Sequence, residues 1–181
     1  MGRDHLFALK LWETGLHDAR LLATMVDDPK QITIDQMDKW VRDFDSWDIV
    51  DGSCGNLFDK TPFAVAKAKE WCKREEEFVK RAGFFLMAEL AVHDKQAKDR
   101  LFLDFLPLIV EGSPDKRNFV KKAVNWALRQ IGKRNLKLNK AAVSTALKMR
   151  RMESGAAKRI ASDALRELKS SQVLKRLRKN S

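Results

Sequence analysis

The stretch that decides the fold is RNFVKKAVNWALRQIGKR, residues 117–134. Its apolar residues return every three or four positions, as they do on one face of an α-helix. At 100° per residue they form one stripe, made by Val120, Val124, Ala127 and Ile131. Another face of the same helix carries Lys122, Trp126, Arg129 and Lys133. The stretch therefore predicts a helix with one buried face and one basic face that includes an aromatic ring.

Similar apolar stripes extend in both directions along the chain and predict an all-α fold. Strands are not expected, because Tyr is absent and β-branched residues do not alternate with polar ones over any long run. Short helices joined by brief connections favour an α-solenoid of degenerate helical repeats, with an irregular bundle as the alternative. The expected helices span 4–13, 16–26, 33–44, 47–57, 62–73, 75–92, 94–111, 114–134, 140–153 and 156–178.

Several of these helix starts depend on capping signals. Thr61-Pro62 and Ser113-Pro114 each have the pattern of an N-cap followed by proline at the first helical position. Asn139 can cap the helix that follows it. The basic tail after residue 170 has two interpretations, a capping helix or a solvated, frayed terminus.

The charge of the chain is unevenly distributed. Residues 1–113 hold 16 Lys and Arg against 21 Asp and Glu, whereas residues 114–181 hold 20 against 4, a net charge of +16. So basic a segment favours a polyanionic partner, most simply nucleic acid. An anionic membrane surface or an acidic protein would give the same signal.

Other features exclude several classes of protein. No apolar run approaches the roughly 18 residues that span a bilayer, and the N-terminal sequence does not have the pattern of a signal peptide. Cys54 and Cys72 lie far apart in the sequence, and the three histidines are scattered. We therefore expect a reduced, cytoplasmic protein with no disulfide, no metal, no other cofactor and no membrane segment.

A first candidate site lies in DSWDIVDGSC, residues 45–54. Trp47 and Asp51 are one helical turn apart and would share a face. The ordinary interpretation is a tryptophan in the core and acids that interact favourably with the start of a helix. The functional interpretation is a carboxylate placed where a cationic substrate binds.

A second candidate is Arg81, which interrupts the apolar helix FVKRAGFFLMAELAV, residues 78–92. A buried arginine needs a partner, because its isolated charge is costly to desolvate. It can pair with an acid such as Asp51, hold a phosphate with two hydrogen bonds, or reach solvent at the edge of the stripe. Trp126 among its cations is likewise either a nucleic-acid surface or an aromatic at the core boundary.

Taken together, WDIVD (47–51), FVKRA (78–82) and FVKKAVNWALRQIGK (119–133) resemble the AlkD-like DNA alkylation repair family of DNA glycosylases. The resemblance covers about residues 35–170. It implies HEAT-like helical repeats that cradle duplex DNA on a concave, basic face. It also implies one repeat domain over 1–181, with N-terminal helices in 1–32, the family core in 33–170 and a basic tail in 171–181.

The resemblance implies a role for each matched residue. Asp51 takes the place of the family's catalytic carboxylate. Trp47 and Trp126 match the aromatics that hold the deoxyribose of the damaged nucleotide. Arg81 matches the arginine beside the DNA backbone at the lesion. From the basic face we add three expected DNA-binding cations, Lys122, Arg129 and Lys133.

The implied activity is that of a monofunctional glycosylase that excises 3-methyladenine and 7-methylguanine without flipping the base. An alkylated purine is a cation and leaves without a general acid, so the enzyme has to stabilise positive charge on the sugar. The expected partner is double-stranded DNA with alkylated bases, bound by a monomer that associates with the nucleoid. The alternatives are a non-catalytic HEAT-like nucleic-acid-binding protein and a solenoid that binds an acidic protein.

Overall fold

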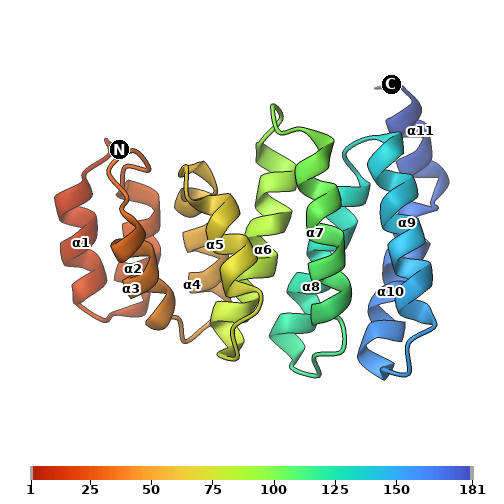
Figure 1. Ribbon diagram of the computed structural model, residues 1–181. Helices are drawn as coiled ribbons and strands as arrows, with labels where there is room; N and C mark the ends of the chain where they lie inside the picture. Colours follow the sequence, from red (N-terminus) through yellow and green to blue (C-terminus); the bar gives the residue numbers. More distant parts are fainter. Residues whose placement is uncertain (1, 180–181) are drawn as a thin grey trace.

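The computed structural model describes residues 2–179 as an elongated array of α-helices running from the N-terminal to the C-terminal end (Figure 1). Successive helices pack mainly on their neighbours, as in a solenoid. No β-strand occurs in the described part of the chain, so the all-α prediction is confirmed. The α-helices are α1 (His5–Glu13), α2 (His17–Val26), α3 (Ile34–Arg42), α4 (Trp47–Gly52), α5 (Ala64–Trp71), α6 (Glu77–His93), α7 (Asp99–Gly112), α8 (Asn118–Gly132), α9 (Leu136–Arg150), α10 (Gly155–Leu168) and α11 (Ser171–Lys179).

The helix on which the fold prediction rests, α8, lies inside the array. It packs against α6, α7, α9 and α10, and in Figure 1 α7 and α9 lie in front of α8 and α10. Its predicted apolar stripe is fully buried, at Val120, Val124, Ala127 and Ile131. Because α8 buries this stripe among the helices that precede and follow it, neighbouring repeats share one continuous core.

The N-terminal end of the array is held by a pair of stacked indoles. Trp12 of α1 and Trp40 of α3 lie with ring centroids 3.9 Å apart and planes 4° from parallel. The indole N–H of Trp12 donates a hydrogen bond to Asp43, 2.8 Å away. Both tryptophans are almost fully buried, so large apolar area and a satisfied polar atom fix the first helices together.

Two proline motifs do not start helices where the sequence predicted. The Thr61 hydroxyl donates to the carbonyl of Phe58, 2.8 Å away, and the Ser113 hydroxyl donates to the carbonyl of Val110, also 2.8 Å away. Each hydroxyl therefore closes the turn before it instead of capping the turn after it. As a result, α5 and α8 begin two and four residues later than predicted.

Asn139 is not the N-cap of its helix, as the sequence predicted. The cap of α9 is Asn135, whose side chain accepts a hydrogen bond from the amide of Leu138. Asn139 is instead buried and donates to the carbonyls of Gly132, at 3.0 Å, and Leu168, at 3.2 Å. Its amide therefore ties α9 to the ends of α8 and α10.

The helix predicted over 156–178 is two helices, α10 and α11, separated by a turn. Ser170 in this turn accepts a hydrogen bond from the amide of Val173, which starts α11. Val173 and Leu177 are buried, and α11 packs on α9 and α10. The basic tail is therefore a capping helix as far as residue 179, and the last two residues of the predicted tail lie outside the described residues.

The helix predicted over 47–57 changes character part-way. After α4 the backbone continues as a π-helical turn, η1 (Ser53–Leu57), and then as a 3₁₀ turn, η2 (Phe58–Lys60). Such π turns are rare and are found frequently at functional sites.

The two cysteines are buried free thiols. In residues 2–179 no helix has both the length and the apolar character that crossing a membrane requires.

Candidate active site

Helices α4 and α6 bring Asp51 and Arg81 into direct contact. The Arg81 Nη2 atom donates to both carboxylate oxygens of Asp51, at 2.6 and 2.8 Å, and its Nε donates at 3.1 Å. Its Nη1 donates to the backbone carbonyl of Phe119, 2.9 Å away. Arg81 is only 5% exposed, so of the three interpretations open from the sequence the structure shows the buried ion pair. The pair joins α4, α6 and the start of α8.

Two aromatic rings hold the guanidinium in place. The Arg81 Cζ atom lies 5.5 Å from the ring centre of Phe85 and 6.0 Å from that of Phe119. With all its contacts to carboxylate, carbonyl and rings, the arginine has a single defined orientation. It in turn fixes the orientation of the Asp51 carboxylate.

Asp51 remains partly open to solvent although Arg81 is not. Its side chain is 26% exposed. Burial raises the pKa of Asp51, and the positive charge of Arg81 only partly offsets this effect. The carboxylate is therefore a fixed, partly desolvated group, which interacts more strongly with a nearby cation than a carboxylate in water does.

Asp51 and Arg81 line a cleft of about 390 Å³ that lies between α6 and α8. The other lining residues are Phe85, Glu89, Lys122, Ala123, Asn125, Trp126 and Arg129. The structure thus brings together five of the predicted site residues. They are the carboxylate Asp51, the indole Trp126 and the cations Arg81, Lys122 and Arg129. Two predicted residues, Trp47 and Lys133, do not line the cleft. Trp47 is 52% exposed on the first turn of α4.

The cations Arg129 and Lys133 are paired with acids of α10. Lys133 lies 2.8 Å from Glu167, and Arg129 contacts both Glu167 and Asp163. Both cations also lie over the Trp126 ring, at 5.6 Å for Arg129 and 5.3 Å for Lys133. Their charges are therefore partly neutralised, and one structural effect of the pairs is to hold the indole of Trp126 at the cleft.

Glu89 is a cleft residue that the sequence interpretation missed. It lies on the same face of α6 as Arg81 and Phe85, at spacings of eight and four residues. Burial raises the pKa of Glu89, although the neighbouring His93 favours its charged form. A glutamate two turns after an arginine in an otherwise apolar helix was the signal that could have identified it.

Three side chains beside the cleft come close enough to share a metal ion. Ligand atoms of Asp59, Glu89 and His93 lie within 4.8 Å of one another, and no other such group occurs in residues 2–179. These atoms already have partners. The Nδ1 of His93 lies 2.5 Å from Asp59, and Lys60 lies 3.2 Å from the same carboxylate. We therefore interpret the group as a hydrogen-bonded charge cluster in which His93 contacts both Asp59 and Glu89.

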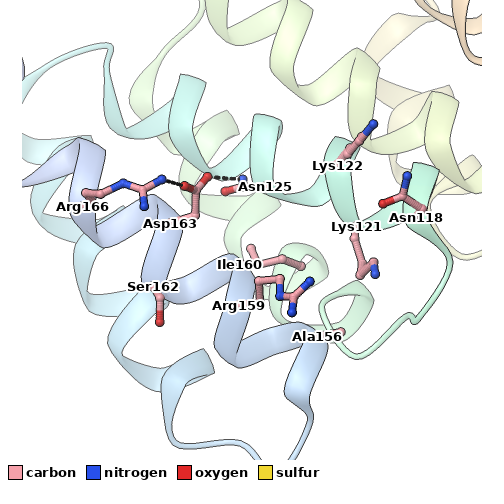
Figure 2. Close-up of a pocket in the computed structure, with 10 residues that line it drawn as sticks. All are labelled: Asn118, Lys121, Lys122, Asn125, Ala156, Arg159, Ile160, Ser162, Asp163 and Arg166. Atoms are coloured by element: carbon pink, nitrogen blue, oxygen red, sulfur yellow. Dashed lines mark hydrogen bonds and ion pairs between the residues drawn. The ribbon is translucent and has the colours of Figure 1, made fainter.

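The cleft continues into a groove of about 420 Å³ between α8 and α10 (Figure 2). Lys122 and Asn125 line both hollows. In Figure 2, Lys121 from α8 and Arg159 from α10 extend into the same opening. Neither these two nor Lys122 forms an ion pair with any part of the chain that the structure describes. They are therefore cations free to meet an anionic ligand.

Comparison with known proteins decides the family. The family model described as DNA alkylation repair enzyme matches residues 2–168. The chain belongs to the DNA alkylation repair enzyme family. The curated proteins compared with it include no match.

A solved structure shows that this member of the DNA alkylation repair family has the HEAT-like fold. It is described as "a new family of proteins related to the HEAT-like repeat DNA glycosylases with affinity for branched DNA structures". The TM-score is 0.73 at 20% identity, over 92% of this chain and 76% of that one. The predicted α-solenoid of HEAT-like repeats is therefore confirmed.

Proposed function

We propose that this chain is a DNA glycosylase that hydrolyses the N-glycosidic bond of purines alkylated at N3 or N7, such as 3-methyladenine and 7-methylguanine. The observation that carries the proposal is the cleft that joins the fixed Asp51 carboxylate to the indole of Trp126. Family membership supports the same reaction class. No flipped-base pocket is required, because the groups act on the sugar at the surface of the duplex.

The chemistry needs few groups. The bond between C1′ and the purine breaks, and its electron pair leaves with the base, which becomes neutral. Positive charge then develops on the deoxyribose, where a fixed carboxylate stabilises it electrostatically. The indole of Trp126 lines the same cleft and offers the sugar an aromatic surface to contact. Water adds at C1′ and loses a proton, which completes the hydrolysis.

The groove beside the cleft supplies the DNA-binding surface of this proposal. Lys121, Lys122 and Arg159 are free of ion pairs among residues 2–179 and line a path that starts at the cleft. Such cations neutralise backbone phosphates and release counterions. We therefore assign the DNA backbone next to the lesion to the α8–α10 groove, with Lys122 where the two hollows meet.

The proposal is tested by measuring release of 7-methylguanine and 3-methyladenine from methylated duplex DNA. Asp51→Asn keeps an oxygen that accepts from Arg81 but removes the negative charge. We expect about 100-fold slower release, which is typical of losing one electrostatic group at a transition state. An Asp51→Asn protein that is folded and as fast as the wild type would refute the assignment.

A second candidate function is non-catalytic binding of nucleic acid. The observation that favours it is the ion pair, because Arg81 donates to both oxygens of Asp51 and offsets its charge. The similar solved structure is described as a protein with affinity for branched DNA. Under this alternative the folded wild type binds duplex or branched DNA and releases no alkylated base.

A further inference from the structure

Glu89 differs from Asp51 in its electrostatic surroundings. Both carboxylates line the same cleft, but Asp51 is bonded by the buried Arg81 whereas Glu89 forms no ion pair with lysine or arginine among the described residues. Its side chain is 13% exposed, and the one basic group within 4 Å is His93, at 3.5 Å. Glu89 is therefore the cleft carboxylate whose negative charge is least offset by a permanent cation.

The surroundings of Glu89 leave room for its carboxylate and hold it in place. It faces Gly55 of the π-helical turn η1, where a Cβ atom would lie 3.2 Å from the Glu89 Oε2. A larger residue at position 55 would press on the carboxylate. Behind it, the buried Asp59 carboxylate accepts from His93, which fixes the imidazole beside Glu89. The π turn and the cluster together position one group at the cleft.

We propose that Glu89 is a second catalytic carboxylate, which lies beside the deoxyribose and accepts the proton of the attacking water. The inference rests on the proposed glycosylase function. In this step an O–H bond of water breaks as its oxygen bonds to C1′, and the proton moves to a Glu89 oxygen. The base has already left with the electron pair of the glycosidic bond, so charge and atoms balance without another reactant.

Asp51 is less suited to receive this proton. Three hydrogen bonds from Arg81 occupy its two oxygens, and protonation would leave a buried guanidinium without its counter-charge. Glu89 lines the same cleft without such a partner, and burial raises its pKa above the ordinary value of glutamate, the direction that makes a carboxylate a stronger base. The two carboxylates therefore have different roles. Asp51 stabilises the sugar cation, and Glu89 accepts the proton.

The first experiment measures single-turnover release of 7-methylguanine against pH. The charged or titratable groups around Glu89 are Asp51, Asp59, Arg81, His93, Lys122 and Arg129. For the wild type we expect the rate to rise with pH as Glu89 ionises. Glu89→Gln should be about 100-fold slower and should lose that rise, while His93→Gln keeps it. Glu111→Gln, an exposed glutamate of α7, is the matched control and should behave as the wild type.

Chemical rescue separates proton transfer from a structural role. Glu89→Ala leaves a space that formate can enter, and added formate should restore part of the rate. Formate should not accelerate Glu89→Gln, whose amide fills the space that the alanine leaves open. Release by Glu89→Gln at the wild-type rate and pH profile, or an absence of rescue, would overturn the assignment of Glu89.

A binding measurement tests the position of Glu89 even in a protein that releases no base. The probes are two duplexes, one with a neutral tetrahydrofuran abasic site and one with a cationic pyrrolidine analogue. The wild type should prefer the cationic site, and Glu89→Gln should lose part of this preference, because Asp51 remains, while it binds the neutral site equally well. A Glu89→Gln protein that keeps the full preference, or a wild type without the preference, would overturn the placement of Glu89 beside the sugar. Absence of base release alone would instead refute the glycosylase proposal.

Discussion

At the scale of single residues, the Asp51–Arg81 pair has both a structural and a chemical consequence. Arg81 is 5% exposed and also bonds the carbonyl of Phe119, so it joins three helices. Removing one partner of a buried pair typically costs about 3–5 kcal/mol. We expect Arg81→Met to lower the free energy of unfolding by about 3 kcal/mol, the lower end of this range, because Asp51 keeps some contact with solvent. Urea denaturation measures the change.

The matched control for this substitution is Arg74→Met. Arg74 pairs with Glu76, 2.6 Å away, but both side chains are about half exposed. Exposed pairs contribute at most about 1 kcal/mol, so the control should unfold nearly as the wild type does. Equal effects of the two substitutions would contradict the structural role of Arg81.

Glu89 predicts a pH-dependent trade-off between stability and function. Its pKa is raised by burial in the folded state, so its ionised form opposes folding. This destabilisation is absent below the ordinary pKa of glutamate and develops as pH rises through the folded-state pKa. Glu89→Gln should therefore unfold at a higher temperature than the wild type at neutral pH. The difference should vanish in acid, and a difference that grows in acid would contradict this account.

At the scale of helices, close backbone contact between α5 and α6 depends on Gly83. A Cβ atom at this position would lie 2.2 Å from the backbone nitrogen of Cys72, so the two helices would have to separate. We expect Gly83→Ala to lower the free energy of unfolding by about 1–3 kcal/mol or more. Gly155→Ala is the control, because a Cβ atom there has no neighbour within 4 Å. It should leave stability unchanged or raise it slightly.

At the scale of the whole molecule, only some of the cations that give residues 114–181 their net charge of +16 are available to bind DNA. Arg129 and Lys133 are paired across α8 and α10, whereas Lys121 and Arg159 are free among the described residues. We expect the double substitution Lys121→Gln with Arg159→Gln to reduce the slope of log affinity against log salt. The reduction should be about 0.9 for each DNA phosphate that the variant no longer neutralises. Fluorescence anisotropy with duplex DNA measures it.

A control for this experiment lies on another helix. Lys140 of α9 is exposed and forms no ion pair within residues 2–179. Lys140→Gln removes one unit of charge without altering the groove, so it should leave the salt slope nearly unchanged. A control that weakens binding as much as the groove substitutions would indicate a non-specific effect of net charge.

Much of this architecture could be predicted from the sequence, because helical periodicity is a local property. The buried stripe of α8 is an example. The failures required information from distant residues. Asn139 has the local pattern of a cap, and its long-range bonds to α8 and α10 leave no trace in the neighbouring sequence. The pairing of Lys133 with Glu167, 34 positions later, is equally invisible there, and it changes which cations can meet DNA.

The stacked indoles of Trp12 and Trp40 have an optical consequence. Two indoles with centroids 3.9 Å apart couple their electronic excitations, and we expect a paired positive and negative band in the circular dichroism spectrum from transition dipoles twisted within the parallel planes. This band reports on the N-terminal helices alone. The fluorescence that is lost in Trp126→Phe, and so belongs to Trp126 among the five tryptophans, should in contrast respond to ligands that enter the cleft. The chain therefore carries two natural reporters at separate places, and one sample can show whether the first repeat loosens when DNA binds at the cleft.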